Sequence, residues 1–465
     1  MDSVLRERLA KYIPPKDQWT PVDEALYGVD DIYNVPEEKA KKLRTNAIRY
    51  AFKHHYENNK FYHEYCKDQK VSPDDIKTEE DFKRIPLIPD TFFKSYPGIE
   101  QNNGKDFIKW LDHIYTGNLP EIELKKKNPN YDDVIEALAK KDICLTFSSG
   151  TSGRFTFIPR DKVTYDRMEF GAANAILRLL PYSDADRLLP YTPDATRIVG
   201  FIPNPSKTNL FVGRIMESIV NEVYAGNVEI AIDRALTVDL MRISTGRTKN
   251  IKEKIIHKVV SSSQKKIASN LVKYLQRWKK DWEEKKIKIM INGVPVGLDL
   301  LMTYMEDAGL TFNFEDGITV TGGGWKTEEG RSMSPDKFRK RVRDNFGIPE
   351  ENCRDLYGMN ESNLITSTCE GHYRHTLHSL LYPIVLDEKM EPVGFGEYGR
   401  YAFLDPLANS YPGFIVTGDR VKLMEHCPEC DRPGPVIDPD VSRMPGSEGR
   451  GCAIAMGKLL KEAGE

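Results

Sequence analysis

The chain has no apolar run of the roughly 18 residues that a transmembrane helix requires. Its first residues, MDSVLRERLAKYIPPKDQW, also lack the apolar core of a secretory signal peptide. Cysteine is sparse and odd in number, with seven in 465 residues. Such usage favours free thiols or metal ligands in a reducing compartment over a disulfide framework. We therefore expect a cytoplasmic protein without a membrane span.

The chain also lacks a large excess of positive or negative charge. Lys and Arg number 67 against 70 Asp and Glu, which leaves a net charge of −3 and a pI near 6.4. This balance gives no global reason to expect a nucleic-acid partner. No internal repeat of about 20 to 50 residues is apparent. A chain of this length has ample material for one large domain and a small one.

The most informative segment is LTFSSGTSGRFTFIPR, residues 145–160. A strand-like start leads into hydroxyl side chains and two glycines, Gly150 and Gly153, whose freedom at positive φ lets successive N–H groups converge on an anion. Arg154 and Arg160 follow and would add fork-shaped recognition of phosphate oxygens. The segment departs from the GxxxxGK[ST] pattern of P-loop enzymes. It predicts a triphosphate-binding loop, and a polar surface loop is the alternative.

Two later motifs accompany this loop in a fixed order: YGMNE at 357–361 and YPGFIVTGD at 411–419. A phosphate loop followed by YGxxE and then TGD resembles the acyl-adenylate-forming superfamily of acyl-CoA ligases, luciferases and adenylation domains. Residues 85–94, 322–326 and 445–453 look like the acyl-protein synthetase branch, which supplies fatty acid to the reductase of bacterial bioluminescence and is related to phenylacetate-CoA ligases. The resemblance runs from about Phe61 to Ala453, with a large unmatched stretch between.

The resemblance implies an AMP-forming ligase that uses ATP and Mg²⁺. Such an enzyme joins a fatty or aryl carboxylic acid to the α-phosphate of ATP, releases pyrophosphate and passes the acyl group to a thiol. The acceptor is left open between a carrier protein, CoA and an enzyme cysteine. An acyl-CoA ligase of phenylacetate-CoA ligase type and a non-catalytic nucleotide-binding homologue are the alternatives.

Site residues follow from the same motifs. We expect Glu361 to bind Mg²⁺, since one carboxylate with waters and phosphate oxygens is a usual magnesium environment. Arg154 would stabilise charge on the phosphates, and Asp419 would accept the ribose hydroxyls. Arg443 occupies the place where the family has a hinge arginine, although Ser442 replaces the usual glycine before it. The remaining residues expected at the nucleotide are Ser148, Ser149, Gly150, Thr151, Ser152, Gly153, Gly322, Gly323, Gly324, Tyr357, Gly358, Met359 and Asn360.

A second group consists of thiols and imidazoles. Cys427 and Cys430 form a CxxC pair, and Cys369 lies upstream with His372 and His375 close behind it. Three thiolates and one imidazole make a closed structural zinc site. Relatives of phenylacetate-CoA ligase type look similar here. We expect a Zn²⁺ site with His375 preferred over His372, and free thiols in a polar loop are the alternative.

Only 46 residues follow Asp419, too few for the mobile domain of about a hundred residues that larger acyl-CoA ligases carry. We expect an adenylate-forming domain over 1–425 and a truncated C-terminal subdomain over 426–465. In the acyl-protein synthetases a cysteine near the C-terminus receives the acyl group, and Cys452 is the candidate here. A buried structural cysteine is the commoner case.

Apolar spacing predicts a helix starting at Pro36 and strands at 197–203, 228–232, 287–294, 318–320 and 384–386. This alternation indicates a layered α/β fold: a large N-terminal adenylate-forming domain with a very short C-terminal subdomain. A basic helical insertion at about 247–288 departs from the family and carries a local net charge of +10. It is either a solvated face of a core-packed helix or a docking surface for an acidic partner, such as an acyl carrier protein, or for an anionic cofactor.

Overall fold

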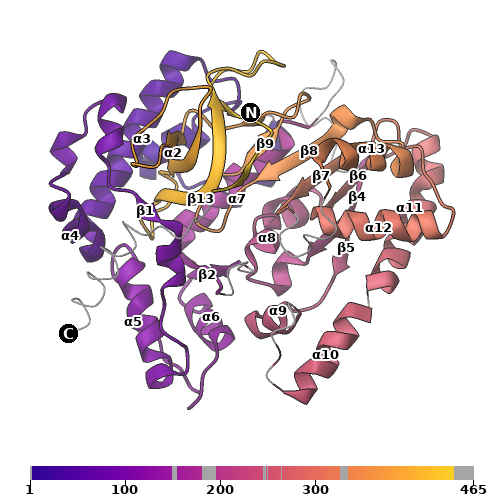
Figure 1. Ribbon diagram of the computed structural model, residues 1–465, viewed down its shortest axis with the longest axis horizontal. Coiled ribbons are helices and arrows are strands. Elements are labelled where there is room, and N and C mark those ends of the chain that lie inside the picture. Colours follow the sequence, from indigo (N-terminus) through magenta and orange to yellow (C-terminus); the bar gives the residue numbers. More distant parts are fainter. Residues whose placement is uncertain are drawn as a thin grey trace.

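The computed structural model describes residues 3–148, 154–180, 195–244, 248, 250–262, 264–324 and 333–444. These residues form a layered α/β molecule in which helices lie on both sides of a large twisted sheet (Figure 1). The predicted α/β class is therefore confirmed.

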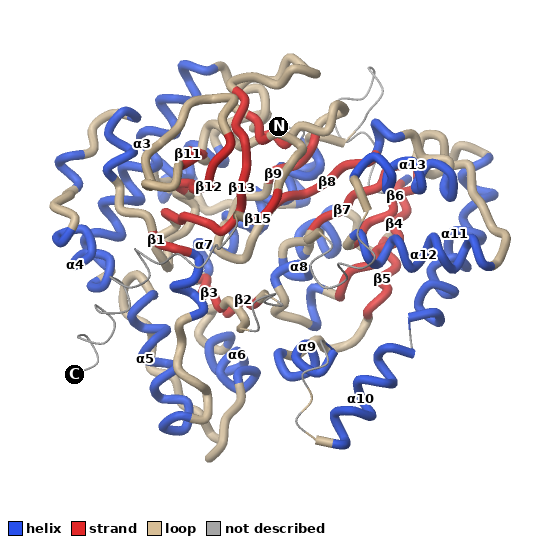
Figure 2. Tube along the Cα trace, viewed as in Figure 1, coloured by secondary structure: helices blue, strands red, loops and turns tan. Residues whose placement is uncertain are grey.

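The main sheet has 13 strands and two halves of different character (Figure 2). The first half is parallel, with neighbouring strands in the order β5, β4, β6, β7 and β8. Their bounds are β4 Thr196–Pro203, β5 Val228–Ile232, β6 Lys288–Gly293, β7 Ile318–Gly322 and β8 Cys353–Tyr357. Four of the five strands expected from the sequence lie here, so that part of the prediction is confirmed.

The second half is antiparallel and continues from β8 through β9, β10, β14, β13 and β12 to β11. The fifth expected strand is β11. Two short strands, β1 and β15, pair with β13 outside this path. The bounds are β1 Ile88–Pro89, β9 Thr366–Thr368, β10 Arg374–His375, β11 Tyr382–Leu386, β12 Tyr398–Leu404, β13 Phe414–Met424, β14 Val436–Ile437 and β15 Ser442–Arg443. Since β14 and β15 join this sheet, residues 426–444 pack with the preceding chain, and the subdomain boundary at 425 stays a prediction.

Helices cover the two halves separately. The helices α11 (Gln264–Glu283), α12 (Pro295–Asp307) and α13 (Pro335–Phe346) share a hydrophobic cluster with β4 and β6. The N-terminal helices α2 (Pro21–Tyr27), α3 (Glu37–Asn58) and α4 (Lys60–Asp68) pack against the antiparallel half. Helix α3 begins at Glu37, one residue after the predicted start at Pro36, and two glutamates in its first turn favour the helix start. The other α-helices are α1 Ser3–Arg8, α5 Lys105–Ile114, α6 Tyr131–Ala139, α7 Lys162–Leu177, α8 Phe211–Arg214, α9 Val238–Ser244 and α10 Ile251–Ser262.

The phosphate-loop segment follows a strand, but that strand does not belong to the main sheet. The strands β2 (Cys144–Phe147) and β3 (Phe157–Arg160) pair antiparallel in a two-stranded sheet of their own. An isolated bridge between Phe147 and Leu210 connects this hairpin to the segment after β4. Helix α7 begins immediately after β3, where the Asp161 carboxylate accepts a hydrogen bond from the Thr164 N–H over 2.8 Å and caps the helix.

The basic insertion forms two helices, α10 and α11. In α11, Leu271, Leu275 and Trp278 are buried against the core, as their spacing predicted. The exposed Lys273, Lys279 and Lys280 of α11 therefore belong to a solvated face on a packed helix, whereas α10 exposes large apolar side chains. Among the described helices, none combines the length and apolar character needed to cross a membrane.

Candidate active site and candidate metal centre

The phosphate loop has a closed base. The Ser148 N–H donates to the Thr156 carbonyl over 3.1 Å, so the two ends of the loop are held side by side. The predicted phosphate contacts at 149–153 lie outside the described residues and stay predictions. Arg154, the first described residue after them, is exposed, and its guanidinium carbon lies 4.6 Å from the centre of the Tyr96 ring. It also donates to the Tyr96 carbonyl. Its predicted role at the phosphates stays a prediction.

The second arginine of the motif, Arg160, has a different role from the one predicted. Its side chain is fully buried and donates to the Asn360 carbonyl over 2.7 Å and to the Ser362 carbonyl over 3.2 Å. It also donates to the Asn363 side chain over 2.8 Å and to the Thr146 hydroxyl. Because this guanidinium is enclosed and hydrogen-bonded within the protein, the prediction that it recognises phosphate is wrong. Arg160 connects the phosphate-loop hairpin to the YGMNE segment.

The loop that carries Glu361 is fixed through its backbone. Besides the two carbonyls held by Arg160, the Glu361 carbonyl accepts a hydrogen bond from the Tyr411 hydroxyl over 3.1 Å. Glu361 itself is 5% exposed. The structure therefore brings the first two motifs together and holds the predicted magnesium ligand on a constrained backbone.

Asn360 strengthens the same connection. Its Nδ2 donates to the Thr156 carbonyl over 3.0 Å and to the Thr146 carbonyl over 3.4 Å, and its Oδ1 accepts from the Thr146 hydroxyl over 2.8 Å. Asn360 is only 2% exposed, so its side-chain amide makes its hydrogen bonds with groups inside the protein. The sequence suggested a contact with nucleotide at this position. In the structure its side chain acts as a connector between β2, β3 and the YGMNE loop.

The second and third motifs meet at Asp419. The Tyr357 hydroxyl donates to Asp419 Oδ2 over 2.7 Å, and Arg443 Nη1 lies 3.0 Å from Asp419 Oδ1. Asp419 and Arg443 are directly paired between β13 and β15. Burial, and then the Asp419 charge, raise the pKa of Tyr357 well above its usual value, so the phenol stays a hydrogen-bond donor. The carboxylate expected at the ribose is thus oriented from both sides.

The glycine triplet ends β7 at the same edge of the sheet. Gly323 and Gly324 have φ angles of 85° and 61°, where a side chain would be strained. Both are exposed, and a Cβ on Gly322 would lie 3.2 Å from the side chain of Leu356 in the neighbouring strand β8. The predicted close approach of adenine to this backbone stays a prediction. Gly358 and Met359 follow the end of β8 in the loop leading to Glu361.

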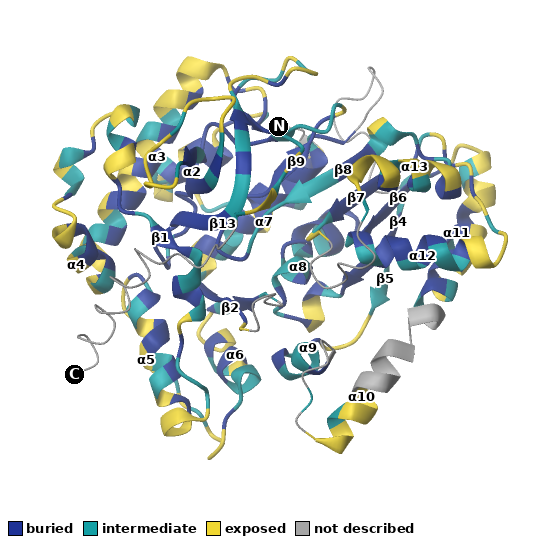
Figure 3. Cartoon of the chain, viewed as in Figure 1, coloured by how far each residue is buried: buried dark blue, intermediate teal, exposed yellow. Residues whose placement is uncertain are grey.

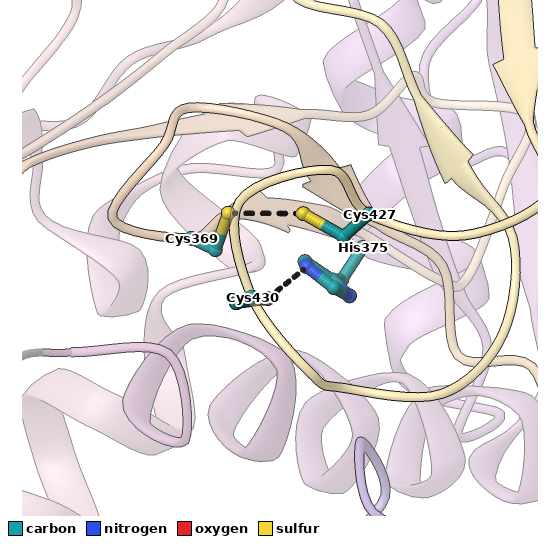
Figure 4. A group of neighbouring side chains, drawn as sticks. All are labelled: Cys369, His375, Cys427 and Cys430. Atoms are coloured by element: carbon teal, nitrogen blue, oxygen red, sulfur yellow. Dashed lines mark hydrogen bonds between the residues drawn. The ribbon is translucent and has the colours of Figure 1, made fainter.

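Four potential metal ligands converge between β9 and β14 (Figure 4). The ligand atoms of Cys369, His375, Cys427 and Cys430 all lie within 4.8 Å of one another. The Sγ atoms of Cys369 and Cys427 are 3.7 Å apart, and Cys430 Sγ is 3.3 Å from His375 Nε2. Zn–S bonds of about 2.3 Å in a tetrahedron place two sulfurs about 3.8 Å apart. The donor set and spacing therefore fit Zn²⁺.

The three thiols of this cluster differ in acidity. The pKa of the Cys430 thiol is lowered, chiefly by its hydrogen bond with Cys369 and also by His375. The pKa of Cys369 is raised, chiefly by its hydrogen bond with Cys430, and burial raises the pKa of Cys427. The segments that carry the ligands are further joined by an ion pair between Arg432 and Glu370, with N–O distances of 2.9 and 3.2 Å. His372, the less favoured imidazole of the sequence, is not in the cluster.

Sequence reasoning missed the residues that connect these parts. Asp355 accepts hydrogen bonds from Thr321 at 2.9 Å and from Arg374 at 2.8 Å. Each of these partners is a long-range contact, and no local sequence motif identifies it. The predicted acyl acceptor Cys452 lies outside the described residues.

Two solved structures that are similar to this one show its fold. A 2-hydroxyisobutyryl-CoA ligase in complex with 2-HIB-AMP and CoA superposes with a TM-score of 0.58 at 14% identity, covering 94% of this chain and 73% of that chain. An open conformation of that ligase gives 0.57 at 13% identity, covering 89% of this chain and 71% of that one. The fold is that of the AMP-forming acyl ligases.

Comparison of the sequence identifies the family within this fold. The model of the acyl-protein synthetase family, LuxE, matches residues 20–119 and 258–461. The long-chain-fatty-acid–luciferin-component ligase of Aliivibrio fischeri is 25% identical over 429 residues, which cover 91% of this chain and 90% of that protein. The Vibrio harveyi protein of the same name is 24% identical over 448 residues, 95% of this chain and 94% of that one. The chain belongs to the LuxE acyl-protein synthetase family.

Proposed function

We propose that this protein activates a long-chain fatty acid with ATP and transfers the acyl group to a thiol. Family membership supports the reaction class, and the names of the two relatives support the fatty-acid substrate. One observation carries the site assignment: hydrogen bonds join all three nucleotide motifs into one cluster through Arg160, Asn360 and Tyr357.

In the first step a carboxylate oxygen of the acid attacks the α-phosphorus of ATP, and the bond to pyrophosphate breaks. Glu361 would bind Mg²⁺, which spreads the charge of the phosphates as they separate. Arg154 and the hydroxyls of the phosphate loop would contact the β- and γ-phosphates. Asp419 would accept the ribose hydroxyls, with Tyr357 and Arg443 fixing its two oxygens.

In the second step a thiolate attacks the acyl carbon and AMP leaves, so a thioester forms and the thiol proton goes to solvent or buffer. The family description, acyl-protein synthetase, favours a protein as the acceptor. Cys452, a carrier protein and CoA are the three acceptors to compare.

The direct test is ATP–pyrophosphate exchange with a series of carboxylic acids of increasing chain length. The wild-type protein should exchange label fastest with long-chain acids. Glu361→Gln should lower the rate at least a hundredfold, the size expected when one electrostatic contact in a transition state is lost. Glu388→Gln, at an exposed turn, is the matched control and should keep the wild-type rate. Exchange by wild type with no acid would overturn the proposed function, and normal exchange by Glu361→Gln would remove Glu361 from the site.

We also propose that Cys369, His375, Cys427 and Cys430 bind one structural Zn²⁺. The spacing of the ligand atoms and the soft donor set support it. Elemental analysis of protein purified without added metal should give close to one zinc per chain. Cys427→Ser together with Cys430→Ser should abolish it, whereas Cys353→Ser, a buried cysteine outside the cluster, should not. A fully folded and active protein with no metal would contradict this assignment.

A further inference from the structure

The backbone around Glu361 is held by one side chain from each of the other two motifs, Arg160 and Tyr411. Three successive carbonyls, those of Asn360, Glu361 and Ser362, each accept a hydrogen bond from a buried side chain. Arg160 donates to the first and third, and Tyr411 donates to the second. Both side chains are fully buried.

These two side chains also contact each other and share a partner. The Arg160 guanidinium lies 5.8 Å from the centre of the Tyr411 ring, and Asn363 bonds both of them. Asn363 in turn donates from its backbone and its side chain to the buried Asp405 carboxylate, at 2.6 and 3.2 Å. The result is a polar network without solvent, and such networks hold one geometry when every member is satisfied.

We propose that Arg160 and Tyr411 are positioning residues that set the direction of the Glu361 carboxylate toward Mg²⁺. This inference rests on the proposed role of Glu361. A peptide held at three carbonyls has little freedom to rotate, so the side chain that it carries starts from a fixed Cα–Cβ direction. Loss of that fixation would change the geometry of the metal contact more than the affinity for the nucleotide, which the phosphate loop and Asp419 supply.

The test uses Tyr411→Phe, because it removes one hydroxyl and keeps the buried ring. Its ATP–pyrophosphate exchange rate should fall about tenfold, of the size that a small misplacement of a catalytic group produces. The Mg²⁺ concentration for half-maximal exchange should rise, while KM for ATP changes less than twofold. Arg160→Lys should show the same pattern, since lysine keeps the charge but reaches fewer carbonyls.

The double variant Glu361→Gln with Tyr411→Phe separates positioning from general stability. If Tyr411 acts through Glu361, its substitution should add nothing once Glu361 has been replaced. An equal loss in both backgrounds would show that Tyr411 only supports the fold and would overturn the inference. If Glu361→Gln alone has no effect, the proposed function of Glu361 fails instead, so the two failures are distinguishable.

A separate observation concerns the exposed surface of helix α10. Helix α10 holds three of the most exposed large apolar side chains of the described residues: Ile251 at 76%, Ile255 at 58% and Ile256 at 40%. Figure 3 shows the start of this helix as exposed, at the lower edge of the molecule beyond α9. On its other side, Glu253 forms a two-point ion pair with Arg242 of α9, at 2.8 and 3.0 Å, which fixes the helix in place.

Positively charged side chains lie beside the exposed isoleucines of α10. Lys252 and Lys254 are exposed among them, and the surrounding segment 247–288 carries +10 in a chain whose total is −3. At 100° per residue Lys252 falls between Ile255 and Ile256. A cation inside the apolar arc disfavours burial in a lipid interface, and the like charge of a second copy disfavours self-association. An acidic protein with apolar residues at its docking face fits this surface best.

We infer that α10 docks an acidic carrier protein that presents the acceptor thiol of the second step, which rests on the proposed function. The probe is a purified bacterial holo-acyl carrier protein, with binding measured by fluorescence anisotropy at 50 and 300 mM salt. Wild type should bind and weaken with salt. Ile251→Glu with Ile255→Glu should weaken binding at least tenfold, with exchange of pyrophosphate unchanged.

The matched control is Val163→Glu, at an isolated side chain that is 45% exposed. It should bind the carrier as wild type does. No binding by wild type, or equal binding by the α10 variant, would overturn the inference. So would α10-dependent binding to anionic vesicles, or a dimer in gel filtration that the α10 variant abolishes. If wild type and both variants show no ATP–pyrophosphate exchange, the proposed function fails. The binding measurement still tests the docking surface in that case.

Discussion

A buried carboxyl group in α7 makes the stability of this protein depend on pH. Glu169 is fully buried, and its Oε2 accepts a hydrogen bond from the Ser218 N–H over 2.8 Å. Its Oε1 has no hydrogen-bond partner among the described residues. Burial, followed by the charge of Glu217, raises the pKa of Glu169 from 4.5 to about 8. Arg214, paired with Glu217 at 2.6 Å, opposes this shift without cancelling it.

The sign of the effect follows from proton uptake. In the unfolded chain Glu169 loses its proton near pH 4.5, whereas the folded protein keeps it until about pH 8. Between these values the native state binds more protons, so the free energy of unfolding falls as pH rises. The slope from one such group is at most about 1.4 kcal/mol per pH unit, which gives an upper bound of about 5 kcal/mol over the whole window.

Urea unfolding at several values between pH 5 and 8 measures this slope. Glu169→Gln keeps the shape of the side chain and cannot ionise, so its stability should depend less on pH, and the variant should exceed wild type most at pH 8. Glu388→Gln, at an exposed turn, should follow wild type throughout. Parallel pH profiles for wild type and Glu169→Gln would refute the argument.

Three further results are expected. Asp419→Ala should weaken ATP binding at least tenfold in calorimetry while affinity for the carboxylic acid stays similar, and unchanged ATP affinity would remove Asp419 from the ribose site. Tyr357→Phe removes one bond to Asp419 but keeps the ring, so ATP affinity should fall less than in Asp419→Ala; a larger fall would show that the hydroxyl itself contacts nucleotide. Chelation of the proposed zinc should lower the melting temperature, because closed metal sites stabilise folding strongly; a melting curve unaffected by chelator would count against the metal.

The sequence predicted the elements that depend on local patterns. Four of the five parallel strands, β4 to β7, appeared as short β-branched runs and were found within a few residues of their expected positions, whereas β8 was not expected. Gly323 and Gly324 were informative because positive φ is a local requirement that glycine meets without strain. Leu271, Leu275 and Trp278 showed the buried face of α11 by their spacing.

The role of Arg160 could not be inferred in this way. Its four partners include carbonyls that lie about 200 positions away in the chain, and a carbonyl carries no sequence signal. Exposed arginines commonly bind phosphate through their guanidinium group, so an arginine near a phosphate loop suggested the same role here. Burial decides between the two roles, and burial of one arginine depends on how β3 packs against the loop after β8.

Glu169 illustrates the same limit on a helix. Twelve of the sixteen residues of α7 are buried, so the helix is enclosed on nearly all sides. A glutamate in such a position breaks the usual rule that carboxylates face water. Its neighbours, Glu217 and Ser218, come from a segment that the sequence alone did not assign.

The strand β10 connects the proposed metal site to the residues that orient Asp419. Successive residues of a strand point to opposite faces. His375 lies in the thiol cluster, and its neighbour Arg374 bonds Asp355 at 2.8 Å, two residues before Tyr357. Arg374 also donates to the Pro439 carbonyl over 2.9 Å, shortly before Arg443. A metal that fixes β10 therefore fixes the two segments that orient Asp419, and loss of the metal should reduce activity through ATP binding before it affects the phosphate-loop hairpin.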